Sequence, residues 1–450
     1  MSQFQKMGRV QKYGKKLIKS GGLGLGGLPY IWGLICKGLM QSPVYRLENG
    51  LRIIHRQWRG SGVEHMGLVA DVGSRDEQED AWGLAHLLEH MLFKGSRQRS
   101  ARQTLTRLEE VGGDLNAYTT RERTCLYASY PQKHLRRAVE LLTDIYADAL
   151  IPEHELQREK KVIREEIMQY RDDYEERLLD VFEQAMFPGC SMGRPILGSE
   201  ESLKRLTRTH LIEHKQRYLT AENTVFSYVG PRNLSTVLRM AAPFLLRLPQ
   251  GAPPPPRVAP PSPHTFRREE RMPLSSAHNL LGVRCHPTQH PGRLPLQMLV
   301  HLLGGDALSS RLNLRVRERN ALVYGIETQY TPYSDCGLLY LYFTCTEEKR
   351  HKVLELVGEE LKKLKHATLS ERALRTAREQ FAGRLMLGEE NRQGLMLALG
   401  QAVHDHGEVE TLPQLLLRIR QTTAADLLEE ARQLPDIDDW CQFVWLPDET

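Results

Sequence analysis

Cysteine is scarce in this sequence, and the few cysteines are widely spaced. The chain of 450 residues holds seven of them, and no two form a C-x-x-C pair. They are Cys36, Cys125, Cys190, Cys285, Cys336, Cys345 and Cys441. An odd number without close pairs argues against a disulfide framework and predicts a reducing compartment. The spacing also excludes a zinc ribbon, which needs paired cysteines.

Blocks of lysine and arginine are absent as well. Charged residues make up 26% of the chain and hydrophobic residues 40%, which is ordinary for a soluble globular protein. The net charge of +5 is mild, so no nucleic-acid partner is expected. The length predicts two or more domains.

The first 41 residues differ from the rest of the chain. Six basic residues precede an uncharged stretch from Ser20 to Cys36, which resembles a signal peptide. The stretch is rich in glycine, contains Pro29, is short for a membrane span, and is followed by no A-x-A-like cleavage site. We therefore expect a cytoplasmic protein with an N-terminal extension over 1–41. Export or membrane anchoring through this extension is the alternative, and membrane contact is expected only in that case.

A proline-rich linker divides the remainder. Eight prolines fall within 249–263, which predicts a semi-rigid extended segment. It separates two halves of similar length, 42–248 and 264–450.

Both halves show strand and helix patterns in a similar order. In the first half we expect two strands joined by an Asn-Gly turn over 45–55, and extended segments over 63–72 and 115–130. We expect helices over 80–93, 105–111 and 135–149, and one long helical stretch over 153–186. The second half repeats this order, with a strand at 277–285 and a helix at 295–303. The prediction is an α+β fold of two duplicated domains, each a mostly antiparallel sheet packed against helices.

Residues 86–90 carry the most informative motif. His86-Leu87-Leu88-Glu89-His90 is an H-x-x-E-H pentad, the inverse of the H-E-x-x-H zinc helix. On a helix the two histidines share one face and can both reach a single metal ion. Glu89 borders this face and suits a general base. Paired histidines can also form a solvated polar face, so the pentad alone leaves both interpretations open.

Acidic residues further along offer a third ligand. Glu159 and Glu166 lie seven residues apart on a predicted helix and share a face, whereas Glu165 is rotated away by about 100°. Glu166 follows His90 by 76 positions. Each acid taken alone could equally belong to a solvated helix face.

Together these residues resemble the pitrilysin/insulinase family of inverzincin zinc metallopeptidases, in the branch of mitochondrial processing peptidase and its bacterial two-domain relatives. The resemblance implies one Zn²⁺ per chain, held by His86, His90 and Glu166, with Glu89 as general base. Glu159 matches an upstream acid that supports the site by holding one of the ligands.

Two further segments carry the resemblance. Residues 112–119 resemble the family's G-G-x-x-N-A-x-T segment, an edge strand in relatives, which implies that Asn116 and Ala117 bind the substrate peptide. Arg317 and Tyr324, seven residues apart in the second half, match a pair that holds the substrate backbone and stabilises the oxyanion. Without the resemblance they would be an ordinary exposed charge and a strand aromatic.

The pentad has no counterpart in the second half. Aligning Leu302-Leu303-Gly304-Gly305 with Leu92-Phe93-Lys94-Gly95 places its positions on Leu296, Leu299 and Val300. The second half is therefore expected to be a homologous domain without a zinc motif, in which these positions belong to an apolar core.

The resemblance also sets the expected function. By resemblance, the two domains form half of a clamshell, and the chain is a zinc-dependent endopeptidase that hydrolyses peptides or unfolded polypeptide segments inside it. Because the sequence holds both the zinc motif and the Arg/Tyr pair, we expect a homodimer. The alternatives are a non-catalytic core or assembly subunit of the same fold, and a dedicated processing peptidase for one peptide precursor.

Overall fold

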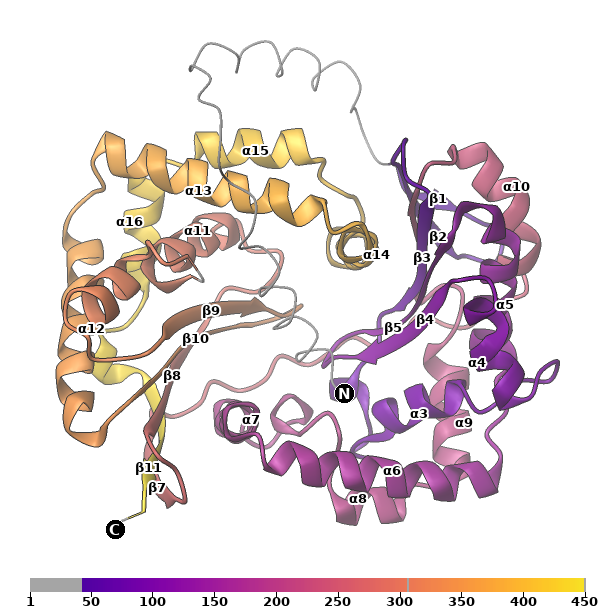
Figure 1. Cartoon of the computed structure of the whole chain (residues 1–450), viewed down its shortest axis with the longest axis horizontal. Coiled ribbons are helices and arrows are strands. Elements are labelled where there is room, and N and C mark those ends of the chain that lie inside the picture. Colours follow the sequence, from indigo (N-terminus) through magenta and orange to yellow (C-terminus); the bar gives the residue numbers. More distant parts are fainter. Residues whose placement is uncertain (1–42, 306, 449–450) are drawn as a thin grey trace. The chain divides into compact units, whose positions relative to one another are not determined.

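The computed structural model describes residues 43–305 and 307–448. The predicted N-terminal extension over 1–41 lies outside these residues. Each half of the chain builds one mixed sheet covered by helices (Figure 1).

The first half forms a six-stranded sheet in the order β1-β2-β6-β3-β5-β4. Its strands are β1 (Tyr45–Arg46), β2 (Arg52–Gln57), β3 (Val63–Ala70), β4 (Asp114–Thr119), β5 (Thr124–Pro131) and β6 (Thr224–Gly230). Only β2 and β6 run parallel; the other neighbouring pairs are antiparallel. Strand β4 therefore lies at one edge of the sheet, paired with β5 alone among the described strands.

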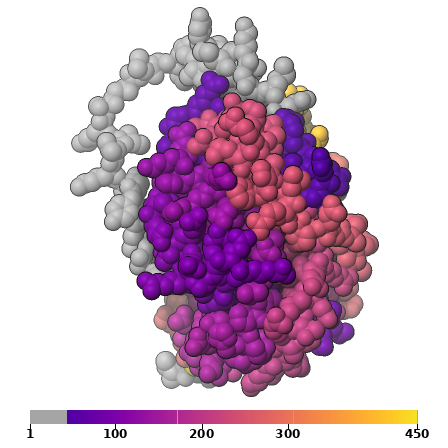
Figure 2. Space-filling view, turned by 90° about the vertical axis from the view of Figure 1, so that its right-hand side faces the viewer, coloured from indigo at the N-terminus to yellow at the C-terminus, as the bar shows by residue number. Residues whose placement is uncertain are grey.

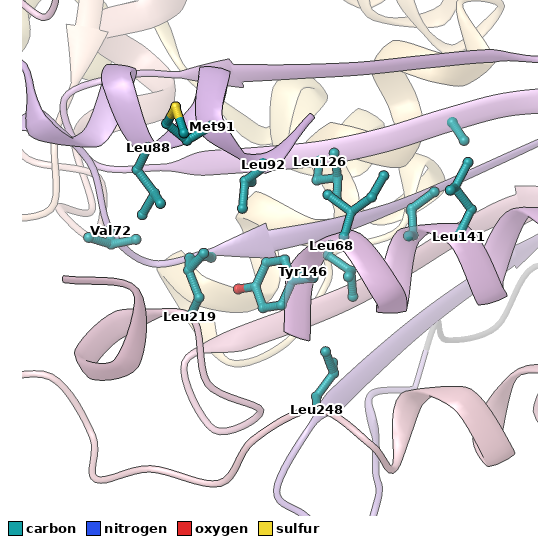
Figure 3. Packing of buried hydrophobic residues seen from close by; sticks show 14 of the residues in the cluster. Leu68, Val72, Leu88, Met91, Leu92, Leu126, Leu141, Tyr146, Leu219 and Leu248 are labelled. Carbon is teal, nitrogen blue, oxygen red and sulfur yellow. The ribbon is translucent and has the colours of Figure 1, made fainter. Parts of the chain in front are cut away.

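The helices of the first half are α3 (Leu84–Leu92), α4 (Ala101–Glu109), α5 (Leu135–Asp148), α6 (Glu153–Arg171), α7 (Tyr174–Met186), α8 (Glu200–Arg205), α9 (Arg208–Tyr218) and α10 (Leu234–Leu245). Helix α3 buries its apolar side on the sheet: Leu88 and Met91 belong to the same buried cluster as Leu68 and Leu126 of the strands (Figure 3). On the side of the molecule drawn in Figure 2, the described surface consists mainly of this half.

The helical stretch expected over 153–186 consists of two helices, because the chain breaks between α6 and α7. The carboxylate of Asp173 accepts hydrogen bonds from the backbone N–H groups of Glu175 and Glu176, both at 3.2 Å. An aspartate in this position caps a new helix and satisfies amides that would otherwise lack partners. Helix α7 can therefore leave in a new direction.

The second half repeats the topology of the first. Its sheet has the order β7-β11-β8-β10-β9, with β7 (Arg267–Met272), β8 (Ala277–Cys285), β9 (Ile326–Pro332), β10 (Gly337–Cys345) and β11 (Cys441–Pro447). Strands β7 and β11 run parallel, as β2 and β6 do, and the remaining pairs are antiparallel. This matching order confirms the predicted α+β fold of two duplicated domains.

The helices of the second half are α11 (Arg293–Gly304), α12 (Arg350–His366), α13 (Glu371–Glu389), α14 (Arg392–His406), α15 (Leu412–Gln421) and α16 (Ala424–Gln433). Helix α11 stands where α3 stands in the first half, packed beside the edge strand β9. Leu296, Leu299 and Val300 of α11 are buried, as expected for positions that have lost the pentad. No helix among the described residues is both long enough and apolar enough to span a bilayer.

Each half lends one helix to the sheet of the other. Met396, Leu399 and Val403 of α14 pack with Val69 and Val225 of the first sheet, and Figure 1 shows α14 beside β3. In return, α7 packs on the second sheet, in a cluster that joins Leu178, Phe182 and Met186 to Leu280, Leu338 and Phe443.

Buried ion pairs also join the two halves. The Arg75 guanidinium pairs with Glu122 and, at 2.8 Å, with Asp335 of the second half. The backbone N–H of Ser334 donates to Glu122 at 3.0 Å. In the linker, Arg257 donates to both carboxylate oxygens of Asp76, at 2.8 and 2.7 Å. A buried charge is costly without its partners, so this cluster holds the linker and the second half against the first.

The seating of α14 depends on Gly400. A methyl group added there would lie 2.7 Å from Val69 Cγ2, a stiff and buried side chain. We predict that Gly400→Ala lowers the free energy of unfolding by about 1–3 kcal/mol, as overpacked cores do. Gly383→Ala is the matched control, because a methyl on Gly383 of α13 meets nothing within 4 Å. It should stabilise the helix by about 0.5–1 kcal/mol. Urea denaturation measures both, and equal effects of the two variants would contradict this packing.

Candidate active site

Helix α3 presents the pentad in a fixed orientation. Leu87 and Leu88 are buried and anchor the helix from below. At its start, the buried Glu77 carboxylate accepts hydrogen bonds from the backbone N–H groups of Gly83 (3.0 Å) and Ala85 (2.8 Å). Burial raises the pKa of Glu77 to about 8, although these two hydrogen bonds oppose the rise. The amide of residue 85 immediately precedes the first histidine, so Glu77 fixes the turn from which the pentad starts.

Three potential metal ligands converge above α3. His86 Nε2 and His90 Nε2 lie 3.9 and 3.8 Å from Glu166 Oε2 on α6. The three ligand atoms lie within 4.8 Å of one another, and this is the only such group among the described residues. Donors around a tetrahedral zinc stand about 3.3 Å apart, so small side-chain rotations bring these atoms to that spacing. The set therefore fits a His₂Glu metal site.

The protonation of the two histidines differs. Burial lowers the pKa of His86 to about 3, which keeps its ring neutral at pH 7, as a metal ligand must be. Burial also acts to lower the pKa of His90. The hydrogen bond with Glu159 and the charges of Glu89 and Glu166 outweigh it, and the pKa of His90 is raised. A cation bound at His90 Nε2 would displace the proton that this nitrogen carries in the charged ring.

Glu159 holds His90 from behind. Its Oε2 atom lies 3.0 Å from His90 Nδ1, which leaves Nε2 directed at Glu166. Its Oε1 atom pairs with Lys94 Nζ at 2.6 Å. Burial acts to raise the pKa of Glu159, but the hydrogen bonds from His90 and Lys94 lower it overall. This is the arrangement expected of a carboxylate that orients a metal-binding imidazole.

Glu89 lies beside the candidate metal ligands and contacts the edge strand. Thr119 Oγ1, at the end of β4, donates a hydrogen bond to Glu89 Oε2 at 2.6 Å. Burial raises the pKa of Glu89 to about 7, although Thr119 and His90 oppose the rise. A carboxyl group in this range can both accept and release a proton near neutral pH.

The residues predicted to bind peptide lie on the same edge strand. Asn116 and Ala117 stand in the middle of β4, which offers its outer edge to no other described strand. Asn116 Nδ2 donates to Asp114 Oδ2 at 2.9 Å, so its side chain is already ordered. The packing of β4 beside α3 brings this strand to the pentad helix.

Arg317 and Tyr324 stand apart from this group. Arg317 lies on a π-helical turn, Asn313–Glu318, and its guanidinium carbon lies 5.9 Å from the centre of the Tyr324 ring. Tyr324 is 89% exposed. Within residues 43–305 and 307–448, no hydrogen bond or ion pair joins either side chain to α3, α6 or β4. Between them Ala321 adopts a left-handed conformation (φ 48°), a strain typical of functional segments.

Three supporting residues escaped the sequence analysis: Glu77, Lys94 and Thr119. In the structure these residues contact groups far away in the sequence or backbone amides. No sequence motif predicts such contacts. Thr119 lies within the G-G-x-x-N-A-x-T segment, which is the one signal that could have found it.

Two family models match consecutive parts of the chain. Residues 61–200 match the model described as "Insulinase (Peptidase family M16)". Residues 205–381 match the model described as "Peptidase M16 inactive domain". The pentad thus falls in the first match, and the second match covers the end of the first half and most of the second half.

Bacterial relatives resemble the chain over most of its length. It is 30% identical to the "Uncharacterized zinc protease YmxG" of Bacillus subtilis over 390 residues, which cover 87% of this chain and 95% of the relative. A protein of Streptomyces coelicolor, also named as an uncharacterized zinc protease, is 30% identical over 397 residues, 86% of each chain.

Solved structures share the fold. A structure titled as a protease from Helicobacter pylori superposes with a TM-score of 0.81 at 18% identity, covering 90% of this chain and 99% of that one. The structure titled as the peptidase M16 inactive domain from Pseudomonas fluorescens gives 0.80 at 18% identity, with 91% and 99% covered. From the sequence relatives, the two family matches and the shared fold, it follows that this chain is a member of the peptidase M16 (insulinase) family.

Proposed function

We propose that this protein is a zinc-dependent endopeptidase that hydrolyses peptides or unfolded polypeptide segments. The observation that carries the proposal is the convergence of His86, His90 and Glu166 beside Glu89. Two imidazoles and a carboxylate form a donor set typical of catalytic zinc, with room for water in a fourth position. The relatives named as zinc proteases support the same activity.

The chain's own residues account for the proton transfers. When bound, zinc supplies Lewis-acid polarisation of the peptide carbonyl and makes water more acidic. Glu89 takes a proton from the attacking water on its carboxylate and passes it to the nitrogen of the leaving amine. Glu159 keeps the His90 ring in one orientation throughout, because its hydrogen bond occupies Nδ1.

Strand β4 is proposed to select extended substrates. A peptide laid along its outer edge would form backbone hydrogen bonds near Asn116 and Ala117, as an added strand does. A segment already paired within a folded sheet has no free backbone groups for this, so the proposed substrates are peptides and unfolded segments.

A second copy of the chain is proposed to supply Arg317 and Tyr324. Both lie in the second half, and the ring of Tyr324 is exposed and available to another molecule. In the proposed homodimer, Tyr324 of one copy stabilises the oxyanion formed at the zinc site of the other.

We also propose that the protein works in a reducing compartment, with the cytoplasm as the expected one. The six cysteines within the described residues are free, which supports this location. The division into 42–248, a linker over 249–263, and 264–450 likewise stays our proposal. It is supported by the presence of one whole sheet in each half.

The metal ligands can be tested with neighbouring acids on α6. We expect Glu166→Gln to reduce the zinc content of purified protein from one per chain to near zero, because a neutral amide is a poor ligand. Glu165→Gln is the matched control, since Glu165 is exposed and is not part of the converging group. Its zinc content should equal that of the wild type. Elemental analysis gives both values, and zinc retained by Glu166→Gln would rule out the proposed ligand set.

The general base can be tested without removing metal. Glu89→Gln should keep its zinc and lose about 10²–10⁴-fold in turnover of a mixed peptide library, the usual contribution of a positioned acid–base group. Glu165→Gln again serves as control and should cleave at the wild-type rate. Cleavage by Glu89→Gln at that rate would refute the mechanism. A wild-type protein that binds zinc and cleaves nothing would favour the non-catalytic subunit instead.

The shared site predicts complementation between inactive variants. Glu89→Gln and Tyr324→Phe should each be impaired, and mixing them after subunit exchange should restore about one quarter of the wild-type sites. Half of the dimers are then mixed, and each mixed dimer has one intact site. A mixture of Glu89→Gln with Glu166→Gln is the control, because both changes fall in the same half-site. Peptide cleavage by the mixtures is measured, and equal rates for both would exclude a site built from two copies.

A further inference from the structure

One residue connects the edge strand with the candidate base. Thr119 is the last residue of β4, and its hydroxyl donates to Glu89 Oε2 at 2.6 Å. Side chains alternate along a strand. The preceding residue, Tyr118, accordingly points to the other face, where its hydroxyl accepts a hydrogen bond from Gln401 of α14 at 3.0 Å. The orientation of Thr119 toward α3 is therefore fixed by the strand as a whole.

The Glu89 carboxylate depends on this contact. Over the part of the chain that the structure describes, Thr119 provides the one hydrogen bond to it. A threonine hydroxyl carries a single proton, and here that proton is committed to Oε2. Oε1 is then the oxygen left to exchange protons with water and the leaving amine.

The backbone behind Thr119 is held firmly. In the turn after β4, Thr120 N–H donates to Arg123 O at 2.8 Å, and Ser74 N–H donates to Thr120 O at 3.0 Å. In the same turn, Glu122 forms a buried ion pair with Arg75. Thr119 thus stands on a fixed turn, while the outer edge of its own strand stays open.

We propose that Thr119 is a positioning residue that sets the orientation of Glu89 and ties it to the strand on which the peptide pairs. The proposal rests on the proposed peptidase function. In this proposal the backbone of β4 receives the substrate, and the side chain at its end holds the base that deprotonates the attacking water. Base and substrate are then positioned by one element, which keeps their distance constant for every extended peptide.

Three threonine variants separate positioning from stability. Thr119→Val removes the donor but keeps the shape, and Thr119→Ser keeps the donor. Thr124→Val is the matched control, because Thr124 pairs with Thr119 across the sheet, is buried, and donates from Oγ1 to Val72 O at 2.9 Å. It loses a comparable hydroxyl without touching Glu89.

We expect Thr119→Val to lower kcat about 10- to 100-fold, the cost of a reacting group displaced by a fraction of an ångström to an ångström. KM and zinc content should stay unchanged, because the strand backbone and the ligands are intact. Thr119→Ser should retain most of the activity. Thr124→Val should lower the melting temperature but leave kcat unchanged.

The outcomes distinguish this inference from the function on which it rests. If the wild type cleaves peptides and Thr119→Val keeps the same kcat, the positioning role is refuted while the peptidase stands. An equal loss of kcat in Thr124→Val would also refute it, because the effect would then come from the stability of the sheet. A wild-type protein without cleavage removes the proposed function itself.

Discussion

The packing of α3 against α6 is the constraint on which the site depends. The pentad supplies two candidate ligand atoms, and the third candidate comes from a helix that begins more than sixty residues later. Leu156, Ile163 and Ile167 form a buried stripe along α6 in the same core as Leu87 and Leu88. Glu159 and Glu166 flank that stripe, so burial of its apolar side chains turns both acids toward the histidines. Burial of the apolar side chains thereby offsets the free-energy cost of bringing together three polar groups that would otherwise favour solvent.

Hydrogen bonds and ion pairs behind the candidate ligands fix their positions further. Lys94 holds Glu159, Glu159 holds His90, and Glu77 holds the first turn of α3. Each contact is a charged or buried hydrogen bond that restricts one rotation, and such restrictions keep a site preorganised. Thr119 restricts the Glu89 carboxylate in the same way from the side of the sheet. The site is therefore fixed from both α6 and β4, and its geometry reflects the whole first domain.

Much of this could be predicted from the sequence, and the failures have physical causes. The pentad and Glu166 could be predicted as a metal site because helical spacing and a family resemblance constrain them. The burial of Leu296 and Val300 could be predicted because apolar residues replace the histidines in the aligned repeat. The break before α7 was missed, since a capping aspartate in a charge-rich segment looks like any other acid. The exchange of α7 and α14 was also invisible, because an apolar helix face does not reveal which sheet it covers.

The same exchange determines how far the two domains depend on each other for stability. The second domain holds Leu296, Leu299 and Val300 at the positions where the first holds the metal motif, so metal binding does not constrain these residues. Here the first sheet is covered on one face by α14, and the second sheet is covered by α7. Deleting either domain would strip the other of part of its core. The two domains therefore form one structural unit, and a substitution that disturbs the core of one is expected to weaken the other.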